Sequence, residues 1–267
     1  GFQRVLWGLV KKVVVADRIG VLVNQVYADP AAYPAPVLAL ATYLFAFQLY
    51  LDFGAYADIA VGTAGMMGVK LRENFNWPFL ARNPAEFWSR WHMSLTTWFL
   101  DYVYAPMVRS VRNESVRAFV PTLAVMLLVG VWHGAAWNFA AFGLFSGLTL
   151  VIHHGARRVL PWGRRGIFGD YGWSGPLATV LYFLGVNFCI ALLFRAPDLP
   201  TAWAILSRIF TGPWIWDEWF TPYLAVILIL AAFHVVRGTL MADRKGFALP
   251  APVRGAFWFG MLMLILF

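Results

Sequence analysis

One histidine stands out as a group that could do chemistry, because it lies between two long apolar runs. His133 sits in the segment Leu-Val-Gly-Val-Trp-His-Gly-Ala-Ala-Trp-Asn-Phe (128–139), and the apolar runs are 118–131 and 139–152. In water this could be a buried loop histidine that helps packing. In a membrane, an ionisable side chain at depth is by default a functional-site hypothesis. The residues alone fit both interpretations equally well.

A second histidine belongs to an aromatic helix. Asn83 is a suitable N-cap, Pro84 suits the first helical position, and Glu86 is favoured by the positive helix end. One helix running through 84–99 would then place His92 on its apolar face, in a three-four spacing with Trp88, Trp91, Leu95 and Phe99. Packing of His92 among these aromatic rings and Trp98 fits nearly as well as a catalytic role.

The other polar residues within the apolar segments give weaker indications of a function. Asn138 could polarise a carbonyl, although asparagine at a helix start is more often a cap. His153 and His154 are adjacent and would point to different helix faces, so a metal pair is not expected. Asp52 and Asp58 are six residues apart and so not neighbours on one helix face, which argues against a carboxylate pair that works together. They are either membrane-buried carboxylates with partners or the sides of a watery pocket. The sequence has no Walker loop, dinucleotide-binding glycine pattern, CxxC or HExxH.

The composition predicts which class of protein holds these residues. The chain has 267 residues, of which 61% are hydrophobic and only 13% are charged, against about 25% charged in soluble domains. Its net charge of +8 is spread over short basic clusters between apolar runs, as in cytoplasmic loops of membrane proteins. We therefore expect a polytopic membrane protein and no binding of nucleic acid.

Basic residues on both sides of His133 predict a membrane hairpin. Arginines occur in 109–117 and again at 157–165, so the positive-inside rule places both ends of the hairpin in the cytoplasm. The two apolar arms have about 14 residues each, roughly 21 Å as helix, whereas the hydrocarbon core is about 30 Å thick. Each arm is short for a full crossing. His133 would then lie at the apex, at the end of a pocket buried in protein.

Other segments complete the expected topology. Residues 2–27 predict an amphipathic or partly buried helix near the cytoplasmic surface, and 37–69 a long apolar helix broken near Gly54. A clean span is expected at 176–194, an interfacial helix at 201–210, a returning apolar helix at 222–236 and the start of another span at 253–267.

Several ordered motifs resemble those of a known family. They are Gln-Leu-Tyr-Leu-Asp-Phe-Gly-Ala-Tyr-Ala-Asp-Ile-Ala-Val-Gly (48–62), Glu-Asn-Phe-Asn-Trp-Pro (73–78), Glu-Phe-Trp-Ser-Arg-Trp-His-Met-Ser-Leu-Thr-Thr-Trp (86–98) and Trp-His-Gly-Ala-Ala-Trp (132–137). Gly-Leu-Val-Lys-Lys (8–12) and Phe-Arg-Ala (194–196) fit as well. Together they resemble the membrane-bound O-acyltransferases, in particular the bacterial branch typified by alginate O-acetyltransferase.

The resemblance implies an all-α, polytopic transmembrane fold with short or re-entrant helices around a membrane-embedded pocket. It implies that residues 1–267 are one O-acyltransferase domain, the C-terminal portion of a longer protein cut at both ends. By motif position, His133 matches the catalytic histidine and His92 a second functional histidine. Trp88, Trp91, Trp132 and Asn138 are our candidates for substrate binding.

The resemblance also implies a reaction. The donor would be acetyl-CoA from the cytoplasm, with no bound cofactor or metal, and the acyl group would pass to an extracytoplasmic polysaccharide or partner protein. The location would be the bacterial inner membrane, crossed several times. Two alternatives remain open. One is the D-alanyl transfer protein of teichoic acid synthesis. The other is a transporter or flippase, since broken helices and buried carboxylates such as Asp52 and Asp58 also mark substrate pathways.

Overall fold

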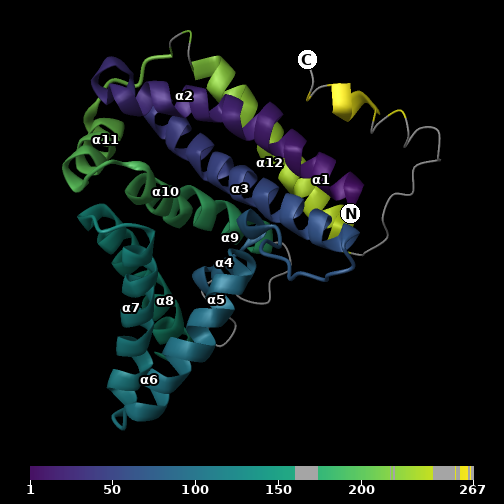
Figure 1. The fold of residues 1–267 in the computed structure, drawn as a ribbon. Coiled ribbons are helices and arrows are strands. Elements are labelled where there is room, and N and C mark those ends of the chain that lie inside the picture. The colour runs from purple at the N-terminus through teal and green to yellow at the C-terminus, as the bar shows by residue number, and fades with distance from the viewer. Residues whose placement is uncertain are drawn as a thin grey trace. The chain divides into compact units, whose positions relative to one another are not determined.

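The computed structural model describes residues 1–159, 174–216, 218, 220–242, 256, 259–263 and 265. Helices joined by short connections make up this part of the chain, and no strand occurs in it (Figure 1). Within it, three helices are long and apolar enough to cross a membrane, namely Ala35–Met66, Trp137–Ala156 and Leu177–Arg195. The prediction of an all-α membrane protein is confirmed.

The chain divides into two compact units, which are described separately. Unit 1 comprises 1–74 and 207–267, and unit 2 comprises 75–206. That the whole chain acts as one O-acyltransferase domain stays a prediction.

Unit 1 is built around one long helix. α1 (Phe2–Leu9), the π-helical segment η1 (Val10–Ala16) and α2 (Asp17–Ala28) follow one another and pack against α3 (Ala35–Met66). α3 is continuous over 32 residues, so the break expected near Gly54 is wrong. Gly54 is buried in this helix, and small residues here allow close packing. A Cβ at Gly8 would lie only 2.8 Å from the carbonyl oxygen of Ala55.

The carboxylates of α3 have cationic partners from the first helical segment. Asp58 lies 2.5 Å from the Nζ of Lys11 and 2.8 Å from Arg4, which also pairs with Glu73. Asp52 lies 2.7 Å from the Nζ of Lys12. Both carboxylates therefore have partners, as one of the two interpretations predicted, although the Asp52 side chain is 45% exposed and only Asp58 is largely buried.

The returning apolar helix of unit 1 is also present. α12 (Phe220–Ala242) packs beside α3. The hydroxyl of Tyr223, which is 1% exposed, donates to the carbonyl of Leu22 at 3.1 Å and so joins this helix to α2. The segment 253–267 falls mostly outside the described residues.

Unit 2 begins with short helices. After η3 (Pro78–Leu80), α4 (Pro84–Arg90) starts as predicted, because the side chain of Asn83 accepts a hydrogen bond from the Glu86 amide at 2.9 Å. α5 (Met93–Phe99), the π-helical η4 (Leu100–Tyr104) and α6 (Ala105–Ser110) follow. The single helix expected over 84–99 is wrong, since Trp91 is extended and His92 adopts a left-handed conformation. Thr96 compensates for the break by donating through its amide to His92 and through its hydroxyl to Trp91.

The predicted hairpin is formed by α7 (Glu114–His133) and α8 (Trp137–Val159), which pack along each other. Their 20 and 23 residues correspond to about 30 and 35 Å, as long as the hydrocarbon core is thick. Of the two arms, α8 has an apolar stretch long enough to cross a membrane, Trp137–Ala156, so the expectation of a short arm is wrong there. The apolar part of α7 is the shorter stretch Phe119–His133, as expected. At its start, α7 is capped by Asn113, whose side chain accepts from the Val116 amide at 3.1 Å.

The last helices of unit 2 follow the hairpin in the chain, and one of them packs against it. α9 (Ser174–Tyr182), the π-helical η6 (Phe183–Asn187) and α10 (Phe188–Arg195) form the continuous helix predicted for 176–194, and α10 packs on α8. α11 (Leu199–Thr211), the helix expected at 201–210, begins in unit 2 and ends in unit 1.

Candidate functional site

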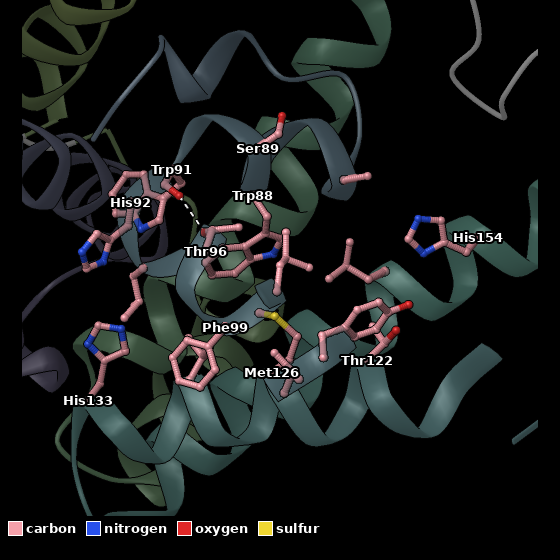
Figure 2. A pocket seen from close by; sticks show the side chains of 17 residues that line it. Trp88, Ser89, Trp91, His92, Thr96, Phe99, Thr122, Met126, His133 and His154 are labelled. Atoms are coloured by element: carbon pink, nitrogen blue, oxygen red, sulfur yellow. Dashed lines mark hydrogen bonds between the residues drawn. The ribbon is translucent and has the colours of Figure 1, made fainter. Parts of the chain in front are cut away.

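Unit 2 contains a cavity of about 340 Å³, lined entirely by residues 85–154. One wall comes from α4, α5 and η4, and the other from α7 and α8 (Figure 2). Its volume lies within the range of about 300–1,000 Å³ that is usual for small-molecule sites. The cavity is therefore large enough for a ligand much bigger than an acetyl group.

The two candidate catalytic histidines line the same cavity. His133 comes from the last turn of α7, and His92 from the connection between α4 and α5. Figure 2 shows them near each other at one end, with His154 of α8 at the opposite end. The structure therefore brings together two imidazoles that lie 41 positions apart in the sequence.

The wall between the two ends is mostly apolar. Along α7 it follows the helical spacing Thr122, Val125, Met126, Val129 and His133. Thr122 and His133 are eleven positions apart, which is about 16 Å along a helix. The cavity thus offers an elongated apolar slot that ends at the histidines.

His92 has an unusual backbone for its residue type. Its φ of 42° and ψ of 53° are left-handed, which costs a non-glycine residue of order 1–3 kcal/mol and is common at functional sites. Burial and, to a smaller degree, the nearby His133 lower the pKa of His92 to about 4. At pH 7 its imidazole is therefore neutral.

The His133 imidazole is surrounded by aromatic rings. Its centroid lies 4.8 Å from the rings of Trp132 and Phe194, 5.9 Å from Phe142 and 6.3 Å from Phe139. It makes no hydrogen bond with any of the residues that the structure describes. An unbonded imidazole nitrogen at the end of a cavity is available to accept a proton from a bound molecule.

Two of the four predicted substrate-binding residues line the cavity. Trp88 and Trp91 do, and the indole Nε1 of Trp88 is buried with no hydrogen-bond partner among the described residues. Trp132 lies beside both histidines, with its ring 6.1 Å from that of His92, and is 57% exposed. Asn138 is 2% exposed and bonds to the backbone of 193 and 196 instead of lining the cavity.

The arginines near the site have local carboxylate partners. Arg82 and Arg90 both pair with Glu86, at 2.9 and 2.6 Å. Burial would raise the pKa of Glu86, but the hydrogen bonds from Arg82 and the charge of Arg90 outweigh it and hold the pKa below its usual value. These charges therefore stabilise the start of α4.

Sequence reasoning missed several residues of the cavity wall. Thr122, Met126 and Tyr104 line it, and so does His154, which the sequence did not connect with the site. The three-four spacing along 122–133 was an available signal. This spacing was hard to recognise because apolar residues lie on every face of α7. The pattern therefore does not indicate which face lines a cavity.

The lowered pKa of His92 predicts an effect of pH on stability. An unfolded histidine has a pKa near 6.5, so between about pH 6.5 and pH 4 the unfolded chain binds a proton that folded His92 does not. Wild-type stability should fall over this interval as the pH decreases. In His92→Gln this loss should be smaller. Thermal unfolding of both proteins in detergent at a series of pH values measures the difference, and parallel curves would contradict it.

Comparisons with known proteins identify the family to which the chain is similar. A model described as MBOAT, membrane-bound O-acyltransferase family, matches residues 2–193. The chain is 35% identical over 217 residues to a probable alginate O-acetylase of Azotobacter vinelandii, covering 80% of this chain and 41% of the relative. It is 37% identical over 205 residues to a peptidoglycan O-acetyltransferase of Helicobacter pylori, covering 75% and 36%.

A third relative has a different acyl group in its name. The chain is 32% identical over 160 residues to a teichoic acid D-alanyltransferase of Streptococcus thermophilus, covering 56% of this chain and 38% of the relative. The chain thus spans about two fifths of the length of these curated relatives.

Proposed function

The chain belongs to the membrane-bound O-acyltransferase family, and on that premise we propose that it transfers an acetyl group from a thioester donor to a hydroxyl acceptor. The observation that carries the proposal is the pair of histidines at one end of an elongated apolar cavity. The donor we propose is acetyl-CoA. Its acetyl group would fill only a small part of about 340 Å³, and the pantetheine arm would occupy the rest.

His133 is the proposed general base. As the acceptor oxygen attacks the thioester carbonyl carbon, the neutral imidazole takes the hydroxyl proton, and a new carbon–oxygen bond forms. The carbon–sulfur bond then breaks, and the imidazolium returns the proton to the departing thiolate. A covalent route, in which His133 carries the acetyl group transiently, uses the same side chain as nucleophile. His92, which is neutral and lines the same end, is proposed to orient the thioester.

The acceptor we propose is an extracytoplasmic polysaccharide, reached directly or through a partner protein. The names of the alginate and peptidoglycan relatives support this class of acceptor. Bacterial relatives and the apolar helices support a multi-pass protein of the inner membrane. The transporter alternative rests in part on Asp52 and Asp58 as carboxylates of a substrate pathway. Because both are ion-paired within unit 1, they give it no support.

The indole N–H of Trp88, which has no hydrogen-bond partner among the described residues, predicts a contact with the donor arm. We expect its N–H to donate to an amide carbonyl of pantetheine, a bond worth about 0.5–1.5 kcal/mol, or about 2–12-fold in binding. Trp88→Phe should therefore raise the KM for acetyl-CoA by about that factor and change kcat little. A short alkyl thioester of acetate, which has no amide, serves as the control donor. An equal increase in KM for both donors would mean that Trp88 only packs.

The test of the proposed function compares three possible substrates on the full-length protein. In membranes that carry envelope polysaccharide, [¹⁴C]acetyl-CoA should yield alkali-labile label in the polymer. The D-alanyl thioester of a carrier protein should yield none. Proteoliposomes loaded with the polymer should show no transport of it without acyl transfer. Label only from the D-alanyl donor, or transport without transfer, would overturn the proposal.

A further inference from the structure

No hydrogen bond from the residues that the structure describes fixes the orientation of His133. In sites where a histidine acts as a base, a third group commonly holds the imidazole in place. The His133 imidazole forms a hydrogen bond with none of the described residues, which leaves packing against neighbouring rings to hold it in place. Its closest ring contact from another helix is Phe194, at 4.8 Å with an interplanar angle of 75°.

Phe194 connects the rings around His133. It also makes edge contacts with Phe139 and Phe142, each at a centroid distance of 5.3 Å with angles of 79° and 87°. Both of these rings touch His133. Moving Phe194 would therefore loosen three of the rings that confine the imidazole. Unlike Phe139 and Phe142, it belongs to α10, so its place depends on how α10 docks against the hairpin.

Asn138 fixes the end of α10. The last carbonyls of a helix lack intrahelical partners, and the Asn138 amide donates to two of them. Its Nδ2 lies 2.9 Å from the oxygen of Ala196 and 3.4 Å from that of Leu193. Leu193 directly precedes Phe194, and Ala196 lies two positions after it. Asn138 and Ala196 are each 2% exposed, so water does not compete for the bonds.

We propose that Phe194, held in place by Asn138, positions the His133 imidazole for acyl transfer. This inference depends on the proposed function, in which His133 reacts. It gives a role to the Phe-Arg-Ala motif at 194–196, and it makes Asn138 a positioning residue that acts on the reaction without touching the substrate.

The expected losses are in turnover. A misplacement of about 1 Å at a reacting group can cost about 10²-fold in rate. Phe194→Leu keeps most of the volume but loses the ring, and Asn138→Asp keeps the shape but turns an oxygen toward two carbonyl oxygens. Each should lower kcat by about 10- to 100-fold with the KM for acetyl-CoA within about twofold of wild type. Phe194→Tyr, which keeps the ring, should restore most of the turnover.

The test measures kcat and KM for acetyl-CoA on full-length proteins, with a control from the same helix. Phe183→Ala also removes a ring, but this ring packs on Phe79 at 5.2 Å, eleven positions before Phe194. We expect Phe183→Ala to lower the unfolding temperature without changing kcat. The double variant of 138 and 194 should lose about as much as the worse single variant, because both act through one ring.

Several outcomes would overturn the inference. They are unchanged kcat in Phe194→Leu, equal loss in Phe194→Tyr and Phe194→Leu, or losses that multiply in the double variant. If the Asn138→Asp protein does not fold, the comparison of kcat between Phe194→Leu and Phe194→Tyr still tests the inference. Failure of the proposed function gives a different pattern, since wild type would then transfer no label from acetyl-CoA, or His133→Ala would transfer as much as wild type.

Discussion

Gly143→Ala is expected to prevent the α7–α8 hairpin from folding. A Cβ at this position would lie 2.3 Å from the carbonyl oxygen of Met126 and 3.0 Å from the Cα of Leu127. Both are backbone atoms, so no change of side-chain rotamer relieves the clash. Gly130 of α7 also lies at the contact between α7 and α8. A Cβ added there would be 2.2 Å from the carbonyl oxygen of Phe139. We expect a loss of at least about 3 kcal/mol, at the upper end of overpacking effects.

Gly155 provides the matched control on the same helix. Nothing lies within 4 Å of a Cβ added there, and alanine has a higher helix propensity than glycine by about 1 kcal/mol. Gly155→Ala should therefore be neutral or stabilising. The measurement is the yield of monodisperse protein and its unfolding temperature in detergent. A Gly143→Ala protein as stable as wild type would contradict the close contact between the helices.

His133→Ala is expected to lower acetyl transfer by at least about 10³-fold while the protein still inserts and folds. General acid–base catalysis contributes about 10²–10⁴ to a rate, and a covalent route would lose its nucleophile entirely. The side chain sits at the end of α7, packed by rings and with no hydrogen bond to the part of the chain that the structure describes. Its removal leaves no buried polar partner unsatisfied, so the effect on stability should be modest.

His153→Ala is the control for this substitution. His153 lies on α8 in the same hairpin and is 7% exposed, but it does not line the cavity. Its replacement removes a buried imidazole from the same unit. Transfer by this variant should remain within a few fold of wild type. An equal loss in both histidine variants would point to damage to the hairpin and not to lost chemistry.

The sequence correctly predicted the elements that are determined by interactions between residues close together in the chain. Asn83 and Pro84 start a helix because a cap acts within three residues, and the structure has the predicted hydrogen bond to the Glu86 amide. The hairpin around His133 followed from apolar runs on both sides of a glycine-rich apex. The span at 176–194 followed from an uninterrupted apolar run. The family was predicted from ordered motifs, and it is confirmed.

The predictions were wrong where contacts between residues far apart in the sequence determine the structure. Gly54 suggested a hinge in α3, but neighbouring small residues serve the close approach of α1, which no local pattern shows. The helix break at Trp91 and His92 was missed because the three-four spacing continues across it. Substrate binding by Asn138 stays a prediction, but the sequence did not show which groups its side-chain amide contacts. Its partners lie 55 and 58 positions away on α10.

The most direct test of the central claim follows the label of [¹⁴C]acetyl-CoA in full-length wild-type and His133→Ala proteins. The two proteins are matched for amount and folding, in membranes that carry envelope polysaccharide. The account predicts ester-linked label in the polymer with wild type and a loss of at least about 10³-fold with the variant. Transfer that persists in His133→Ala, within tenfold of wild type, would contradict it.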